Sequence, residues 1–217
     1  MDKKKQFSVR CDECGCVWNL ETWISIDETE DIEAIQMIED GIYFDHFCPE
    51  CGKEYSFVTP TVYFDKEQRF MLCFIEGALD IAQTQHFLNE LTSSLGVEKT
   101  NISIRIATSC NEFREKIILH RNKLDDRVVE LMKLMALEIV RAEGWMQKFD
   151  ETRCSVDASD NIHFDFCGKK PRHLTLIRGK YEQFAQQALE VLNQEPTPLE
   201  INSDWAIEFA TKHGITE

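Results

Sequence analysis

The sequence lacks the long apolar segments that export and membrane insertion require. Its first ten residues, MDKKKQFSVR, are charged and contain no apolar run of signal-peptide length. Nowhere do eighteen apolar residues follow one another, and the longest apolar stretch, FMLCFI at 70–75, has the length of a buried strand. We therefore expect a soluble, cytoplasmic protein that does not contact a membrane.

Basic residues are scarce in one part of the chain, residues 11–67. This stretch has fifteen acidic residues against two lysines, so it carries −13 of the chain's net charge of −15. A nucleic-acid surface needs clustered Lys and Arg side chains to neutralise phosphates. The composition therefore argues against nucleic acid as a partner and favours a basic protein or a second copy of the chain.

Cysteine, by contrast, is abundant, with nine residues. The odd number, the missing export signal and a length of 217 residues all count against a disulfide-stapled scaffold. Four of the nine form two matching motifs, Cys11-Asp12-Glu13-Cys14-Gly15 and Cys48-Pro49-Glu50-Cys51-Gly52.

Each motif is suited to holding one side of a metal ion. Two residues between the cysteines let both sulfurs reach one ion, and the glycine that follows permits a positive φ that turns backbone amides toward the sulfurs. Four thiolates complete a tetrahedral structural zinc site and leave no position open for a substrate. We predict a zinc site with the ligands Cys11, Cys14, Cys48 and Cys51.

Two alternatives concern this site. Iron fits the same four thiolates, and the two motifs are similar to those of rubredoxin, a one-iron electron carrier. This chain is several times longer than such a domain needs, and Cys16 follows its first glycine, so zinc is the prediction and iron the alternative. Cys16 itself is expected to be a small buried or half-buried thiol, and His46 a packing or surface residue.

The pattern of apolar residues predicts an α+β protein. Around the cysteines, alternating residues at 17–27, a helix at 31–41 and a hairpin turning near 66–67 predict antiparallel strands with a helical insert. A helix is expected at 79–95, a strand at 101–108, and helical structure over 112–144 with a break near 122–126. The last helix has an apolar face at i, i+3, i+4, i+7 spacing, formed by Val128, Leu131, Met132, Met135, Ala136 and Ile139.

The last third of the chain predicts two or three short strands and then a helix at about 180–192. Its segment 167–180 is basic and has no acidic residue. Five cations on a hairpin could bind phosphate, which makes nucleic-acid binding an alternative function, although we expect them to be solvated or paired with the acidic stretch. They are Lys169, Lys170, Arg172, Arg178 and Lys180.

Catalysis has weaker support. Cys110 could serve as a nucleophile, His120 as its base and Asp125 or Asp126 as the orienting carboxylate, but nothing in the sequence brings these residues to one point. A second, incomplete metal pair can also be drawn from Cys154 and Cys167 with His163 or His173, although hairpin packing is the simpler explanation. We therefore assign no catalytic residue.

With these features in place, the sequence resembles the CpXC family of bacterial and archaeal proteins. The resemblance is carried by both cysteine motifs and by VWNLETWISID, EDGIYFDHFCPECGKEYSF, TPTVYFDKEQRFMLCFI and RIATSCNEFREKIILHRNKLDDRVVELMK. Asp12 departs from the proline that the family's name leads one to expect, whereas Pro49 meets it.

The resemblance implies a CpXC-type domain at 8–140, with a zinc ribbon at about 8–75 packed with a strand and helix part at about 76–140. A C-terminal α+β extension, a hairpin plus a helix, follows at 145–217. The resemblance brings no activity with it. The functional hypothesis is therefore a zinc-ribbon protein of undetermined activity that acts as an interaction or scaffold protein.

Overall fold

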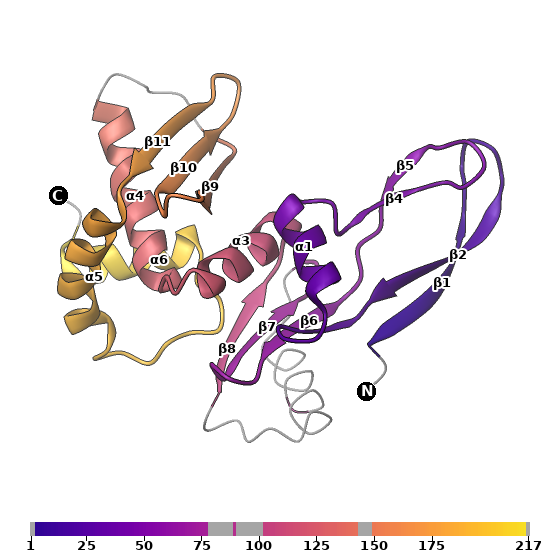
Figure 1. Cartoon of the computed structure of the whole chain (residues 1–217). Coiled ribbons are helices and arrows are strands. Elements are labelled where there is room, and N and C mark those ends of the chain that lie inside the picture. The colour runs from indigo at the N-terminus through magenta and orange to yellow at the C-terminus, as the bar shows by residue number, and fades with distance from the viewer. Residues whose placement is uncertain (1–2, 78–88, 90–101, 143–148, 216–217) are drawn as a thin grey trace. The chain divides into compact units, whose positions relative to one another are not determined.

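The computed structural model describes residues 3–77, 89, 102–142 and 149–215 (Figure 1). The helix expected at 79–95 lies outside these residues, apart from residue 89. The chain forms two compact units, Met1–Arg114 and Glu115–Glu217. In the described part of the chain, no helix combines the length and the apolar character needed to cross a bilayer.

The first unit contains two antiparallel hairpins that share no sheet with each other. Strands β1 (Lys4–Arg10) and β2 (Val17–Trp23) pair along their whole length. Strands β4 (Asp45–Phe47) and β5 (Glu54–Ser56) form a much shorter hairpin. Each hairpin carries one cysteine motif at its turn, so the sequence elements predicted to bind metal are both presented on strand ends.

A four-stranded sheet with the order β3-β6-β7-β8 forms the core of the first unit. Its strands are β3 (Ser25–Asp27), β6 (Thr61–Asp65), β7 (Phe70–Phe74) and β8 (Ser103–Ala107). Strands β6 and β7 are the antiparallel hairpin predicted to turn near residues 66–67, whereas β3 and β8 add to it in parallel. Every residue of β6 is buried, as expected for a strand covered on both faces.

Helix α1 (Ile32–Asp40) is the insert that the sequence predicts between the two hairpins. Its buried residues, Ala34, Ile35 and Ile38, follow helical spacing. The helix ends at Gly41, whose φ of +78° allows its amide and that of Ile42 to reach the last free carbonyls. The next residues, Tyr43 and Phe44, then pack in an aromatic cluster with Phe74 and Phe113.

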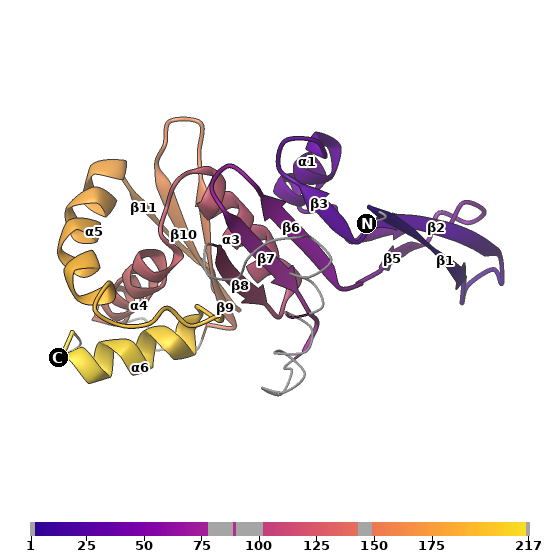
Figure 2. The same ribbon diagram turned by 90° about the horizontal axis from the view of Figure 1, so that it is seen from below.

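The second unit surrounds a separate apolar core. Helix α3 (Cys110–Arg121) begins in the first unit, and α4 (Asp126–Ala142) follows after the break predicted near 122–126. Strands β9 (Glu151–Val156), β10 (Ile162–Cys167) and β11 (Arg172–Leu176) form an antiparallel sheet with β10 in the middle. Helices α5 (Arg178–Leu192) and α6 (Ser203–His213) complete the unit, and α4 contacts both of them and β10 (Figure 2).

The predicted face of α4 is partly wrong. Val128, Leu131, Met132 and Ala136 are buried, but Met135 is 40% exposed and Ile139 is 52% exposed. Their places in the interior are taken by residues on an adjacent stripe of the helix, Val129, Glu130, Lys133 and Val140. Apolar spacing missed this rotation because two of the buried residues are charged.

Those two charged residues belong to a buried ion cluster. Lys133 Nζ contacts Glu115 and lies 2.9 Å from Glu130 Oε1, and all three side chains are about nine-tenths buried or more. Glu115 also accepts the backbone amide of Cys154 at 2.5 Å, which connects α3 to strand β9. Burial raises the pKa of Glu115, although the Lys133 ammonium opposes the shift.

The compact units do not divide where the sequence-based domains were drawn. The boundary between the units falls at Arg114 and Glu115, so α4 belongs to the second unit. Packing within a unit and independent folding are different properties, so the division into 8–140 and 145–217 stays a prediction.

Candidate metal centre

The two cysteine motifs have the same backbone hydrogen bonds. In the first, the Cys11 amide donates to Cys16 O at 2.8 Å and the Gly15 amide donates to Cys11 O at 3.0 Å. In the second, the Cys48 amide donates to Lys53 O at 2.8 Å and the Gly52 amide donates to Cys48 O at 2.9 Å. The two turns are therefore equivalent structures.

The glycines explain why these turns close so tightly. Gly15 has a φ of +75° and Gly52 a φ of +71°, values that a residue with a Cβ adopts only with strain. With the chain turned in this way, the Cys14 amide donates to Cys11 Sγ at 3.4 Å. The sequence of the motif thus directs a backbone N–H toward a cysteine sulfur, as is favourable for a thiolate ligand.

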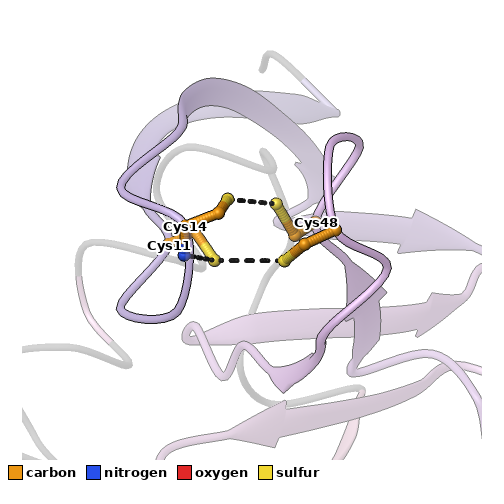
Figure 3. Close-up of side chains that lie close together, drawn as sticks. Cys11, Cys14 and Cys48 are labelled. Atoms are coloured by element: carbon orange, nitrogen blue, oxygen red, sulfur yellow. Dashed lines mark hydrogen bonds between the residues drawn. The ribbon is translucent and has the colours of Figure 1, made fainter.

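The four sulfurs come together between the hairpins (Figure 3). All four Sγ atoms lie within 4.8 Å of one another, and the pairs Cys11–Cys51 and Cys14–Cys48 are both 3.6 Å apart. Sulfurs at the corners of a tetrahedron ~2.3 Å from a central zinc are ~3.8 Å apart. The spacing therefore fits one tetrahedral ion, and the donor set suits either zinc or iron.

The thiols have different pKa values although their motifs match. Burial would raise the pKa of Cys11, but hydrogen bonds from Tyr55 and from the backbone amides lower it to about 6. The pKa of Cys48 is also lowered, again by amide hydrogen bonds acting against burial. An amide lowers the pKa of Cys14, but burial and the facing sulfurs raise it to about 12. The Lys53 amide lowers the pKa of Cys51, but burial and the sulfurs of Cys11 and Cys48 outweigh it, so that this pKa is also raised. Two of the four thiols therefore resist deprotonation in the absence of a cation, and a bound metal ion would stabilise all four as thiolates.

The sequence did not predict that Tyr55 and Lys53 lie beside the cluster, or that Trp18 packs against Tyr55. The Tyr55 hydroxyl lies 3.0 Å from Cys11 Sγ, accepts the Asp12 amide at 3.1 Å and contacts the Asp12 carboxylate. Lys53 Nζ lies 2.9 Å from the same carboxylate. Trp18 packs against the Tyr55 ring with centroids 5.8 Å apart. The signal for Tyr55 was its place four residues after Cys51, but only the strand pairing shows that it reaches the other hairpin.

Cys16 and His46 lie outside the four-sulfur cluster. Among the described residues, the cluster of four cysteine sulfurs contains Cys11, Cys14, Cys48 and Cys51, and neither Cys16 nor His46 belongs to it. Cys16 is half-buried, and burial raises the pKa of its thiol. His46 is half-buried on β4 and packs edge-on against Phe57 with ring centroids 6.2 Å apart.

The five basic residues do not share one hairpin. Lys169 and Lys170 are exposed in the turn after β10, and Arg172 begins β11, whereas Arg178 and Lys180 belong to α5. Arg178 is also held locally: it pairs with Asp160 at 3.1 Å and donates to the backbone carbonyl of Asn122 at 3.0 Å. The expectation of five cations on a hairpin was therefore wrong.

The residues drawn as a catalytic group are also separated. Cys110 is the first residue of α3 and His120 lies ten residues further along it, a helical rise of ~15 Å. Asp125 forms an ion pair with the Arg127 guanidinium at 2.6 Å at the start of the helix.

The two cysteines considered as a second metal pair differ in burial. Cys154 is buried in the core of the second unit, whereas Cys167 is only half-buried.

The fold and the cluster define a protein with a zinc-ribbon-like, four-cysteine site built from two hairpins. A family model described as CpXC protein matches residues 9–133, more than half of the chain. The chain belongs to the CpXC family. Comparisons with curated proteins and with solved structures found no match.

Proposed function

We propose that the four cysteines bind a structural zinc ion, and that the site holds together a surface for binding another protein. The observation that carries the zinc assignment is the closed set of four sulfurs from two equivalent turns. Four protein ligands leave no coordination position for a substrate, which is typical of structural and not of catalytic zinc. The residues that would hold the ion are Cys11, Cys14, Cys48 and Cys51.

The surroundings of the cysteines support a role in protein binding. Asp12, Glu13, Glu50 and Glu54 are exposed in and beside the two motifs. Two large apolar side chains next to the motifs are exposed as well, Val17 at 61% and Phe47 at 62%. Acidic side chains with exposed aromatic and aliphatic ones suit a basic protein surface and repel a phosphate backbone. None of the nine cysteines, all of which the structure describes, forms a disulfide, which supports a reducing compartment such as the cytoplasm.

The metal is tested on the purified full-length protein. Elemental analysis is expected to give one zinc per chain in a colourless protein, falling to none in the Cys11→Ser/Cys48→Ser variant. Cys73→Ser, which changes a buried thiol of the central sheet, is the matched control and keeps its zinc. A red protein that contains iron would replace this assignment with the electron-carrier alternative, for which the exposed sulfurs of Cys14 and Cys51 would be the points of electron entry.

Protein binding is tested separately. Zinc-loaded protein is expected to bind an immobilised lysine-rich peptide, more weakly as salt increases, or to self-associate in sedimentation. The Glu13→Lys/Glu50→Lys variant should lose this binding, whereas Glu208→Lys, on an exposed position of α6, should keep most of it. If wild type binds neither the peptide nor itself at low salt, the interaction role is wrong even if zinc is present.

A further inference from the structure

Two histidines meet on the outer face of the three-stranded sheet, far along the chain from the cysteine motifs. Strand β10 alternates, with Ile162, Phe164 and Phe166 fully buried and the residues between them, His163 and Asp165, on the other face. Strand β11 places His173 and Thr175 on that same outer face. In the antiparallel register, Thr175 is opposite His163 and His173 is opposite Asp165, so all four side chains are neighbours.

Three polar atoms of this group form a small triangle. His163 Nδ1 lies 3.1 Å from His173 Nε2, and Thr175 Oγ1 lies 3.1 Å from the first nitrogen and 2.9 Å from the second. Two ligands that bind one ion at right angles, each ~2.1 Å away, are ~3.0 Å apart. The triangle therefore has the dimensions of three adjacent ligands on one metal ion.

The other nitrogen of each ring faces a carboxylate. His163 Nε2 is 3.0 Å from Asp157 Oδ2, and His173 Nδ1 is 2.7 Å from Asp165 Oδ1. Asp157 is fixed in the β9–β10 turn because it accepts hydrogen bonds from the Asn161 side chain and from the Ser159 and Asn161 amides. Histidines that bind metals usually donate their second N–H to a carboxylate in this way.

These outer hydrogen bonds determine what remains at the inner nitrogens. A neutral histidine has one N–H, and donating that hydrogen to the carboxylate leaves a lone pair on the inner nitrogen. The inner nitrogens then present lone pairs to each other at 3.1 Å, and the single hydroxyl hydrogen of Thr175 can satisfy only one of them. A cation between the two rings removes this conflict.

We propose that His163, His173 and Thr175 form an open binding site for a divalent transition-metal ion, with Asp157 and Asp165 orienting the two imidazoles. Imidazole nitrogens suit zinc, nickel and copper, and the site is open to solvent because the His173 side chain is 51% exposed. Water fills the remaining coordination positions. The site differs from the cysteine centre in having nitrogen and oxygen ligands and free positions, so it binds an exchangeable ion.

The test uses the full-length, zinc-loaded protein and nickel as the probe. Calorimetric titration with Ni²⁺ is expected to show one equivalent bound in wild type and none in His163→Gln or His173→Gln. His213→Gln, a half-buried histidine on α6 that pairs with Glu195, is the matched control and keeps the nickel. Asp165→Asn leaves all three ligands in place and should weaken binding about 10–100-fold.

A spectroscopic measurement locates the ion independently of affinity. In the imidazole NMR spectrum, paramagnetic Ni²⁺ should broaden the signals of His163 and His173 before that of His213. Nickel at the cysteines would instead add thiolate charge-transfer absorption and would depend on Cys11 and Cys48. Equal nickel binding by wild type and by the His163→Gln/His173→Gln variant, or no nickel binding by wild type, would show that the histidine pair shares only a proton and would overturn the proposal.

Discussion

The two cysteine-bearing hairpins and the second unit are held together by different means. None of the residues in β1, β4 or β5 is buried, β2 contributes only Leu20 and Thr22 to the interior, and the turns contribute Cys11 and Cys48. The second unit instead has a continuous apolar core that includes Phe164, Phe166 and Val128. Short hairpins bury too little apolar area to be stable on their own.

The comparison teaches where charged groups are useful inside this protein. In the hairpins, four sulfurs gather where the apolar core is small, and on the proposed function a cation from outside the chain binds them. In the second unit, the cation that contacts two buried glutamates is Lys133, which belongs to the chain itself. The first region should therefore depend on metal supply, whereas the second should not.

Removing the metal should have the largest effect. Zinc removal by a chelator, or Cys48→Ser, is expected to unfold the cysteine hairpins, because structural zinc contributes on the order of 10 kcal/mol to the folding of such modules. Hydrogen exchange read by mass spectrometry should rise over residues 8–70 and stay low over 149–215. Cys16→Ser is the control and should change little. Equal loss of protection in both units would contradict the distinction drawn here.

The buried ion cluster provides the next largest effect, now in the second unit. Lys133→Met leaves Glu115 and Glu130 buried without their cation, and breaking a buried pair in this way typically costs about 3–5 kcal/mol. Urea unfolding should show this loss, while the zinc content stays at one per chain. Lys169→Met, at an exposed position, should unfold like wild type. A Lys133 variant that loses zinc but not stability would reverse the assignment of roles.

Tyr55 tests how far the hairpins depend on groups beyond the sulfurs. Tyr55→Phe removes the hydroxyl next to Cys11 Sγ and should weaken zinc binding about tenfold, as measured by competition with a chromophoric chelator. Tyr43→Phe is the matched control, because its hydroxyl donates to Trp23 O at 2.8 Å and not to a sulfur. Equal affinities of the two variants would show that the hydroxyl does not tune the site.

The smallest expected effect is a pH-dependent one on the surface of the second unit. A hydrogen bond from Lys212 lowers the pKa of Glu195 against a smaller effect of burial, and His213 lowers it further. Because the pKa is lowered in the folded state, the stabilisation is present above the usual value of 4.5 and is lost as the pH falls toward the folded pKa. Glu195→Gln should lower Tm by about 1 °C at pH 7, and this difference should shrink below pH 4. A difference that grows in acid would contradict the sign.

The cysteine motifs and local elements could be predicted from the sequence because their signals are short-range. Matching spacing and glycines predicted the two turns, and apolar periodicity predicted α1, its end at Gly41 and the hairpin of β6 and β7. In each case the residues that carry the signal are those that form the structure. The clustering of the four sulfurs followed from the motifs themselves.

The features that were missed depend on long-range register or on charge in the interior. The face of α4 was misplaced because Glu130 and Lys133 read as solvent-facing residues until Glu115 is placed beside them. Likewise, the meeting of His163 with His173 requires the pairing of β10 with β11, and that of Tyr55 with Cys11 requires two hairpins to approach. No periodicity within one segment contains this information.

The order of the two motifs along the chain sets a delay during synthesis. Thirty-three residues, including β3 and α1, lie between Cys14 and Cys48. An ion captured by the first pair alone would have two sulfur ligands and remain exchangeable, and closing a loop of this length costs ~3 kcal/mol of chain entropy. With the proposed metal centre, a nascent chain would bind its ion through all four sulfurs, and so tightly, only after the second cysteine pair has left the ribosome.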